Sequence, residues 1–195
     1  MKRGLLIVFS GPSGVGKKTV WYPLLKHKSL NLVFSISMTT RKKRFNEVNK
    51  KDYYFVTKAA FKQAVKQGKM LEYATYINNY YGTPKAFVEQ LRDQGKNVLL
   101  EIEPKGAMQI MAYAKKQHDQ GVITIFISPP SLIALEKRLL KRGTEPIQTI
   151  RHRIKQAKWE MSLQDKYDYV IINDYINKAR KHLVTIIKKE ISHNA

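Results

Sequence analysis

Residues 4–21 read GLLIVFSGPSGVGKKTVW, and this stretch determines how the rest of the chain is interpreted. Residues 5–9 are an apolar run rich in β-branched and aromatic side chains, which predicts a buried strand of a parallel sheet. Gly11, Gly14 and Gly16 follow, and glycine accepts the positive φ angles at which a turn can direct several N–H groups at one point. A strand that leads into such a turn predicts an anion-binding loop.

Lys17 completes the pattern G-x-x-x-x-G-K at the start of a predicted helix. In this pattern, backbone amides surround the phosphates of a nucleotide and the lysine reaches the terminal ones. The pattern continues with Ser or Thr, whose hydroxyl binds magnesium, but Lys18 stands at that position. A glycine-rich turn without a ligand is the alternative, which the preceding strand disfavours. The predicted phosphate loop comprises Gly11, Pro12, Ser13, Gly14, Val15, Gly16, Lys17, Lys18 and Thr19.

Length and composition restrict the class of protein. A chain of 195 residues can bury one sizeable core, so we expect a single domain with possible lobes. The absence of cysteine excludes disulfides and thiolate metal sites. Too few apolar residues follow residues 1–3 to predict a signal peptide, and no run approaches the ~18 apolar residues that span a bilayer, so we expect a soluble, cytoplasmic protein.

The chain carries a formal charge of +21, from 36 basic and 15 acidic residues. Such an excess raises the local concentration of phosphorylated ligands without identifying them. A nucleotide enzyme and a protein that binds RNA or DNA would both show it, so charge alone leaves these classes open.

Apolar runs and helical patterns alternate along the chain. Strands are predicted at residues 5–9, 32–35, 53–56, 71–76, 98–102, 122–127 and 169–172. Helices are predicted at residues 17–28, 58–67, 84–94, 104–116, 131–141 and 177–191, with a water-facing, helix-compatible stretch at 142–160. Pro23 should kink or restart the first helix. This order predicts a doubly wound parallel sheet, with residues 36–83 as a small, mostly antiparallel insertion that begins after the second strand.

Five further segments stand in order behind the phosphate loop. They read SISMTTRKKRFNEVNKKDYYF at 35–55, LEYATYINNYYGTP at 71–84, LLEIEPKGA at 99–107, RGTE at 142–145 and YDYVIIND at 167–174. Together with the loop they resemble the guanylate kinase family over nearly the whole chain. The resemblance implies a P-loop fold that transfers the γ-phosphoryl group of ATP to GMP. It divides the chain into a core (1–35, 84–137 and 161–195), a GMP-binding insertion (36–83) and a helical lid (138–160).

The resemblance implies that Arg41, Arg44, Tyr53 and Tyr81 hold the phosphate of GMP. A guanidinium forms two parallel hydrogen bonds to phosphate, and a phenol adds a neutral donor. Taken by residue type alone, a basic loop is also compatible with a solvated surface.

The same resemblance assigns Glu72, Ser37, Thr83 and Glu103 to the guanine base. Guanine presents adjacent N1–H and N2–H₂ donors that one carboxylate can accept, whereas adenine would leave such a carboxylate unsatisfied. A single glutamate in a strand is otherwise a solvent-exposed residue.

Arg142 and Arg153 match the lid arginines of the family, which neutralise charge on the transferring phosphoryl group. Arg138 assists them, and Asn173 matches a position near the adenine of ATP. The alternative for the arginines is an ordinary cationic helix surface. The expected catalytic residues are Lys17, Arg44, Arg142 and Arg153.

The implied cofactor is Mg²⁺, bound mainly by ATP oxygens and water, with Glu101 contacting it through water. Phosphoryl transfer needs positioning and charge neutralisation, so no Ser/His/Asp triad is expected. The five histidines lack metal-ligand spacing and are expected at the surface.

Three neighbouring positions depart from the family, which has a hydroxyl at Lys18 and aspartates at Glu101 and Glu103. Either Glu101 pairs with Lys18 and the metal is held through waters, or metal binding and catalysis are lost; the reach of Glu101 favours the first. The acceptor loop departs as well, at Lys43, Asn46 and Lys50.

An enzyme that uses ATP and GMP, with activity reduced by these changes, is therefore the leading hypothesis. A binding module that has lost catalysis is the second, and a nucleic-acid-binding protein is the third and least favoured, because no run of stacking aromatics is present. No membrane partner is expected. The use of dGMP, and a monomer or homodimer, remain open.

Overall fold

A computed structural model describes residues 2–76, 78–143 and 145–194. Its main sheet has five parallel strands in the order β2-β7-β1-β8-β9. The strands are β1 (Leu6–Ser10), β2 (Leu32–Phe34), β7 (Asn97–Glu101), β8 (Val122–Ser128) and β9 (Tyr169–Ile172). Every residue of β1 is buried, as predicted for the central strand of a sheet covered on both faces.

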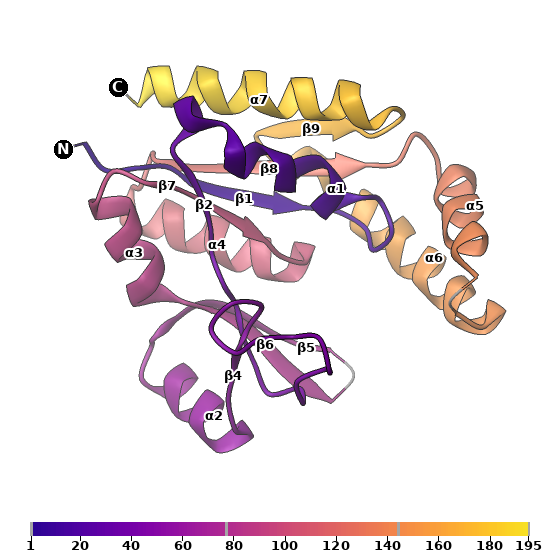
Figure 1. Ribbon diagram of the computed structural model, residues 1–195, viewed down its shortest axis with the longest axis horizontal. Coiled ribbons are helices and arrows are strands. Elements are labelled where there is room, and N and C mark those ends of the chain that lie inside the picture. The colour runs from indigo at the N-terminus through magenta and orange to yellow at the C-terminus, as the bar shows by residue number, and fades with distance from the viewer. Residues whose placement is uncertain (1, 77, 144, 195) are drawn as a thin grey trace.

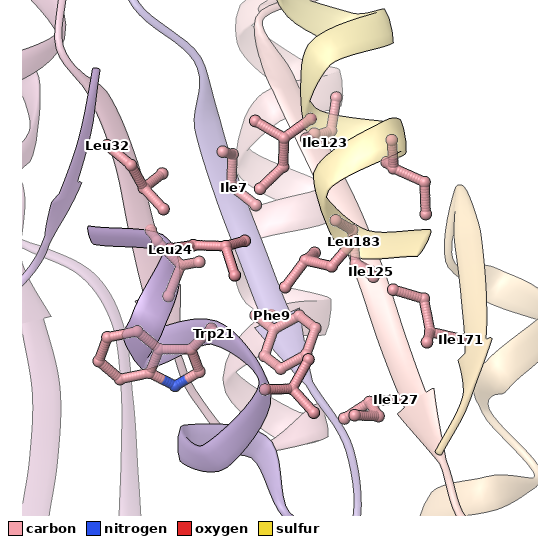
Figure 2. Close-up of a cluster of buried hydrophobic side chains, with 14 of the residues drawn as sticks. Ile7, Phe9, Trp21, Leu24, Leu32, Ile123, Ile125, Ile127, Ile171 and Leu183 are labelled. Carbon is pink, nitrogen blue, oxygen red and sulfur yellow. The ribbon is translucent and has the colours of Figure 1, made fainter. Parts of the chain in front are cut away.

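Helices cover both faces of this sheet (Figure 1). Figure 2 shows one face, where Ile7 and Phe9 of β1 pack with Trp21, Leu24 and Leu183. Leu6 and Val8 of β1 belong to a second hydrophobic cluster on the other face of the sheet, because successive strand residues point to opposite faces. The flanking helices are α1 (Lys17–Trp21), α3 (Lys85–Asp93), α4 (Pro104–Gln117) and α7 (Ile176–His193). The doubly wound architecture is therefore confirmed.

Pro23 restarts the first helix rather than continuing it. The α-helix ends at Trp21, and two short 3₁₀ helices, η1 (Tyr22–Lys26) and η2 (Lys28–Leu30), replace the remaining predicted turns. Proline lacks the N–H that a helix interior requires but fits the first turn of a new helix. Pro23 occupies that first turn in η1.

Residues 38–84 contain a second, mixed sheet with the strand order β4-β3-β6-β5, below the core in Figure 1. The strands are β3 (Met38–Thr39), β4 (Tyr54–Phe55), β5 (Met70–Tyr76) and β6 (Asn79–Pro84). Pairing is antiparallel except between β3 and β4. Thr57 caps the N-terminus of helix α2 (Lys58–Lys66), and its hydroxyl accepts a hydrogen bond from the Ala60 amide at 3.1 Å.

A side-chain amide joins the second sheet to the core. Gln109 of α4 accepts a hydrogen bond from Tyr73 N at 3.1 Å and donates one to Tyr73 O at 2.8 Å. It thereby satisfies both backbone groups of one residue on β5, the edge strand of this sheet. The insertion is thus tied to α4 through the backbone of Tyr73.

Helices α5 (Leu132–Arg142) and α6 (Ile147–Met161) project beyond the strand ends in Figure 1. They share a hydrophobic cluster that includes Leu135, Leu139 and Ile150. The expectation of a wholly water-facing stretch at 142–160 was wrong, because one side of α6 is buried against α5. Thr144, in the RGTE segment, lies outside the described residues. In the part of the chain that the structure describes, no helix is long and apolar enough to span a bilayer.

Candidate active site

The loop after β1 has the geometry of an anion site. Gly11, Gly14 and Gly16 all have positive φ angles. A Cβ atom at Gly11 would lie 2.2 Å from the carbonyl oxygen of Ile127, so only glycine fits there. Lys17 folds back over the loop, with Nζ 2.7 Å from Gly11 O. Burial lowers the pKa of Lys17, and the nearby Glu101 carboxylate opposes this shift.

Glu101 ends β7 beside this loop and is held by an indole. Trp21 Nε1 donates a hydrogen bond to Glu101 Oε2 at 2.5 Å, and the Trp21 ring stacks on Phe34 at 4.4 Å. The prediction that Glu101 pairs with Lys18 was wrong. Lys18 is exposed, and its ammonium lies 5.7 Å from the centroid of the Tyr22 ring. The indole is the nearer donor because it projects from the buried side of α1.

Glu72 is a buried carboxylate, 5% exposed, on β5. Its Oε1 accepts a hydrogen bond from Thr83 Oγ1 at 2.7 Å. Burial raises the pKa of Glu72 to about 7, and the Glu103 charge adds to the shift. Gly106 makes room for the carboxylate, because a Cβ atom there would lie 2.5 Å from Glu72 Oε2. The alternative of a solvent-exposed Glu72 is therefore wrong.

Arg41 lies between two aromatic rings and a carboxylate. Its guanidinium carbon is 5.4 Å from the centroid of Tyr53 and 5.7 Å from that of Phe55. Both terminal nitrogens donate to Glu47, at 2.9 and 2.7 Å. This ion pair raises the pKa of Arg41 and lowers that of Glu47 to about 2. Tyr81 also bonds to Arg41 and meets the Tyr53 ring edge-on at 6.2 Å.

One arginine of each projecting helix contacts the phosphate loop or the end of β9. Arg153 donates a hydrogen bond to Ser13 Oγ at 3.0 Å and pairs with Glu145 at 2.5 Å. Arg138 donates to the carbonyl of Asn173 at 2.7 Å.

Asn173 is 2% exposed, and its amide nitrogen donates to Val15 O at 2.7 Å. It therefore supports the phosphate loop from behind. Its Oδ1 has no hydrogen-bond partner among the described residues.

These side chains line two cavities. The first cavity is a cleft of about 390 Å³ between the core and the second sheet, and it is lined by more of the expected residues than the second. Its expected residues are Gly11, Ser13, Lys17, Ser37, Arg41, Arg44, Tyr53, Glu72, Tyr81, Glu101, Glu103 and Arg153. A second cavity, of about 550 Å³, lies between the phosphate loop and α5 and is lined by Gly14, Val15, Gly16, Thr19, Arg138, Arg142 and Asn173.

Three expected residues do not line either cavity. Pro12 is buried, and its carbonyl accepts a bond from Lys17 at 3.1 Å. Thr83 is buried and contacts Glu72. Lys18 faces solvent.

The residues of or beside the cleft that were not expected include Trp21, Glu47, Gly106, Gln156 and Glu160; Ala74, Gly82 and Ile102 also line it. Glu160 of α6 is 3% exposed, accepts a bond from Gln156 at 3.0 Å, and has a pKa raised by burial. A single acid at the end of a basic helix was the available signal for it. All five histidines are exposed, as predicted. Within the described residues, no three His, Cys, Asp or Glu side chains gather as a metal site.

Known proteins resemble this chain in sequence and in structure. The guanylate kinase family model matches residues 3–190. Guanylate kinase of Lactococcus lactis subsp. lactis is 47% identical over 189 residues, which cover 97% of this chain and 89% of that protein. Guanylate kinase of Oceanobacillus iheyensis is 46% identical with the same coverage.

A solved structure agrees with the sequence relatives. The crystal structure of guanylate kinase from Anaplasma phagocytophilum matches with a TM-score of 0.76 at 34% identity, covering 97% of this chain and 87% of that one. A family model over nearly the whole chain and relatives of such identity confirm the resemblance. The chain belongs to the guanylate kinase family.

Proposed function

We propose that this chain transfers the γ-phosphoryl group of ATP to GMP, giving ADP and GDP. The observation that carries this proposal is the buried Glu72 carboxylate. It lies in the same cleft as the phosphate-loop lysine and the Arg41 and Arg44 side chains. A cleft with a carboxylate at one end and cations at the other suits a purine with two N–H donors and a phosphate.

Selection of guanine over adenine depends on whether the Glu72 carboxylate finds hydrogen-bond donors on the base. Ionised Glu72 accepts from the N1–H and N2–H₂ groups of guanine, while Thr83 holds its Oε1 and Gly106 keeps its Oε2 free of a side chain. Adenine offers an acceptor at N1, which would face the carboxylate with no proton between them. The buried carboxylate therefore disfavours AMP strongly.

The donor nucleotide is expected on the other side of the phosphate loop. Its phosphates would lie along the amides of residues 11–17, with Lys17 at the terminal phosphates. Arg138, Arg142 and Asn173 line the adjoining cavity, which is large enough for the nucleoside. Arg153, already bonded to Ser13, supplies positive charge from the lid.

The residues beside the phosphate loop could accommodate Mg²⁺ only as an ion that is already bound to ATP. Lys18 cannot coordinate a cation, and one oxygen of Glu101 is occupied by Trp21. The second oxygen of Glu101 can accept a hydrogen bond from a metal-bound water. The ion would neutralise phosphate charge.

We propose that the insertion and the lid close over the two nucleotides, because in-line transfer requires their phosphates to meet and water to be excluded. Helix α4, which holds β5 through Gln109, remains in the core while the strands beyond it move.

A binding module without catalysis is the second candidate, and Lys18 favours it. A release assay for ADP distinguishes the two, run with GMP, AMP, CMP and UMP, with and without Mg²⁺. We expect Mg²⁺-dependent turnover with GMP alone, slowed by Lys18. Binding of GMP and ATP without turnover would establish the binding module instead.

A further inference from the structure

The acceptor loop contains one acidic residue among several basic ones. Residues 42–51 include Lys42, Lys43, Arg44, Lys50 and Lys51, with Glu47 as the single acid. A carboxylate among basic residues of a surface loop is ordinarily exposed to solvent. Here the Glu47 side chain is only 16% exposed.

Three hydrogen bonds converge on the Glu47 carboxylate. Arg41 Nη1 and Nη2 donate at 2.9 and 2.7 Å, and the backbone N of Arg44 donates at 2.8 Å. The Glu47 backbone N in turn donates to Arg44 O at 3.1 Å. Glu47 thus closes the turn at residues 44–47 and fastens it to the guanidinium at the start of the loop.

This arrangement makes the two arginines unequal. Arg41 has five N–H donors, and it uses both of those on Nη1, one for Lys42 O at 2.8 Å and one for Glu47. A donor on Nη2 is also taken by Glu47, and Tyr81 bonds to the same guanidinium. The guanidinium of Arg44, by contrast, has no hydrogen bond or ion pair with any described residue, and it lines the cleft.

We infer that Glu47 is a positioning residue of the acceptor site: it holds Arg41 as a fixed support of the loop and presents Arg44 as the principal cation for the acceptor's phosphate. The inference rests on the proposed function. It refines that function, because Arg41 and Arg44 were both expected to hold the phosphate of GMP in the same way. Glu47 itself does not touch the acceptor.

One competing account uses the same contacts. A carboxylate between arginines resembles a phosphate, so Glu47 could be an internal competitor that the acceptor displaces. Displacement would break the bond to the Arg44 amide and open the turn that carries Arg44. It would also leave the Glu47 carboxylate without its partners beside an incoming dianion. The positioning role keeps all three bonds when the acceptor binds.

The two accounts predict opposite signs for Glu47→Gln. Under the positioning role, the KM for GMP rises about tenfold, because the amide loses the charge-assisted bonds to Arg41. Turnover at saturating GMP and the Kd for ATP stay within about twofold. Glu47→Asp, which keeps the charge, restores part of the loss. Tighter GMP binding by Glu47→Gln would overturn the inference in favour of the internal competitor.

Asp52→Asn is the matched control. Asp52 directly follows residues 42–51, its carboxylate accepts a bond from Val48 N at 2.7 Å, and its replacement changes the net charge by the same amount. An asparagine oxygen can keep that bond. We expect an unchanged KM for GMP. An equal rise in both variants would show that only the loop's net charge matters, and would overturn the role of Glu47.

A readout without nucleotide separates this inference from the proposed function. The Arg44 amide should be protected from hydrogen exchange in the free wild type and in Asp52→Asn. It should exchange at least tenfold faster in Glu47→Gln, because in either orientation the glutamine NH₂ group would face an Arg41 donor, and the side chain would leave the turn. Equal exchange in all three would overturn the inference. Failure of the wild type to bind GMP would refute the proposed function alone, since amide exchange still decides whether Glu47 positions the loop.

Discussion

Replacement of Glu72 by glutamine should stabilise the free protein and weaken its binding of GMP at the same time. Glu72 is 5% exposed, and burial raises its pKa to about 7, so the ionised side chain is unfavourable in the empty cleft. The guanine N1–H and N2–H₂ groups require that ionised form, because a protonated carboxyl would direct its own O–H at a donor.

The raised pKa sets the size of the stability effect, and the lost hydrogen bonds set the size of the binding effect. A carboxyl whose pKa is raised on folding costs stability as the pH rises from its unfolded value near 4.5 towards 7. At pH 8 the difference of about 2.5 units corresponds to about 3 kcal/mol, which Glu72→Gln recovers as a higher free energy of unfolding. Loss of hydrogen bonds to a charged group costs about 1.5–3 kcal/mol, so the Kd for GMP should rise about 10- to 150-fold.

The pH dependence supplies an internal check. One unit below the pKa of Glu72, about a tenth of the molecules carry the ionised carboxylate, so at pH 6 wild-type affinity for GMP should be about tenfold below its plateau. The phosphate of GMP titrates near pH 6 as well. Glu72→Gln is the matched control for this second titration, because it keeps the phosphate site and lacks the carboxyl.

Calorimetric titration of GMP and AMP between pH 6 and 8, with thermal denaturation of both proteins at pH 8, measures all of these quantities. The reasoning would be refuted by equal GMP affinity in the two proteins, or by parallel pH profiles. A Tm of Glu72→Gln below that of the wild type at pH 8 would show that the carboxylate is not unfavourable in the empty cleft.

Three further substitutions have defined outcomes. Lys17→Met should reduce turnover at least a thousandfold in a coupled ADP assay. The Tm should not fall, because burial already disfavours the ammonium group. Retained turnover would contradict the placement of Lys17 at the terminal phosphates of ATP. Arg153→Ala removes the bond to Ser13 and should lower kcat about 100-fold with ATP affinity nearly unchanged, as separate kcat and Kd measurements would test. Trp21→Phe frees Glu101 and should raise the Mg²⁺ concentration needed for half-maximal rate several-fold; an unchanged Mg²⁺ titration would show that the indole does not position the carboxylate.

Local patterns predicted the fold well. The buried strand, the three glycines and the lysine all lie within residues 5–17, so their geometry depends on local preferences that can be inferred from the sequence. The second sheet was predicted from its turn residues, and Asn78 has the positive φ angle of 61° that a tight hairpin requires. The first helix was predicted too long, because the spacing of apolar residues continues past Pro23 although the α-helix does not.

Contacts between distant residues were harder to predict. Trp21 and Glu101 lie 80 positions apart, and a tryptophan at helical spacing predicts only a core residue. Lys18 was expected to pair with Glu101 on reach alone, without the direction of the side chain. No role was predicted for Glu47, since only the folded loop brings its carboxylate to Arg41.

Transfer of a radioactive label tests the central claim most directly. The protein is incubated with ATP labelled in the γ-phosphoryl group, Mg²⁺ and an equal mixture of GMP and AMP, and the nucleotides are separated. Because the buried Glu72 carboxylate fits guanine and opposes adenine, the label should appear in GDP, with at most about one part in a hundred in ADP. Label that remains in ATP, is released as inorganic phosphate, or reaches GDP and ADP equally would contradict the account.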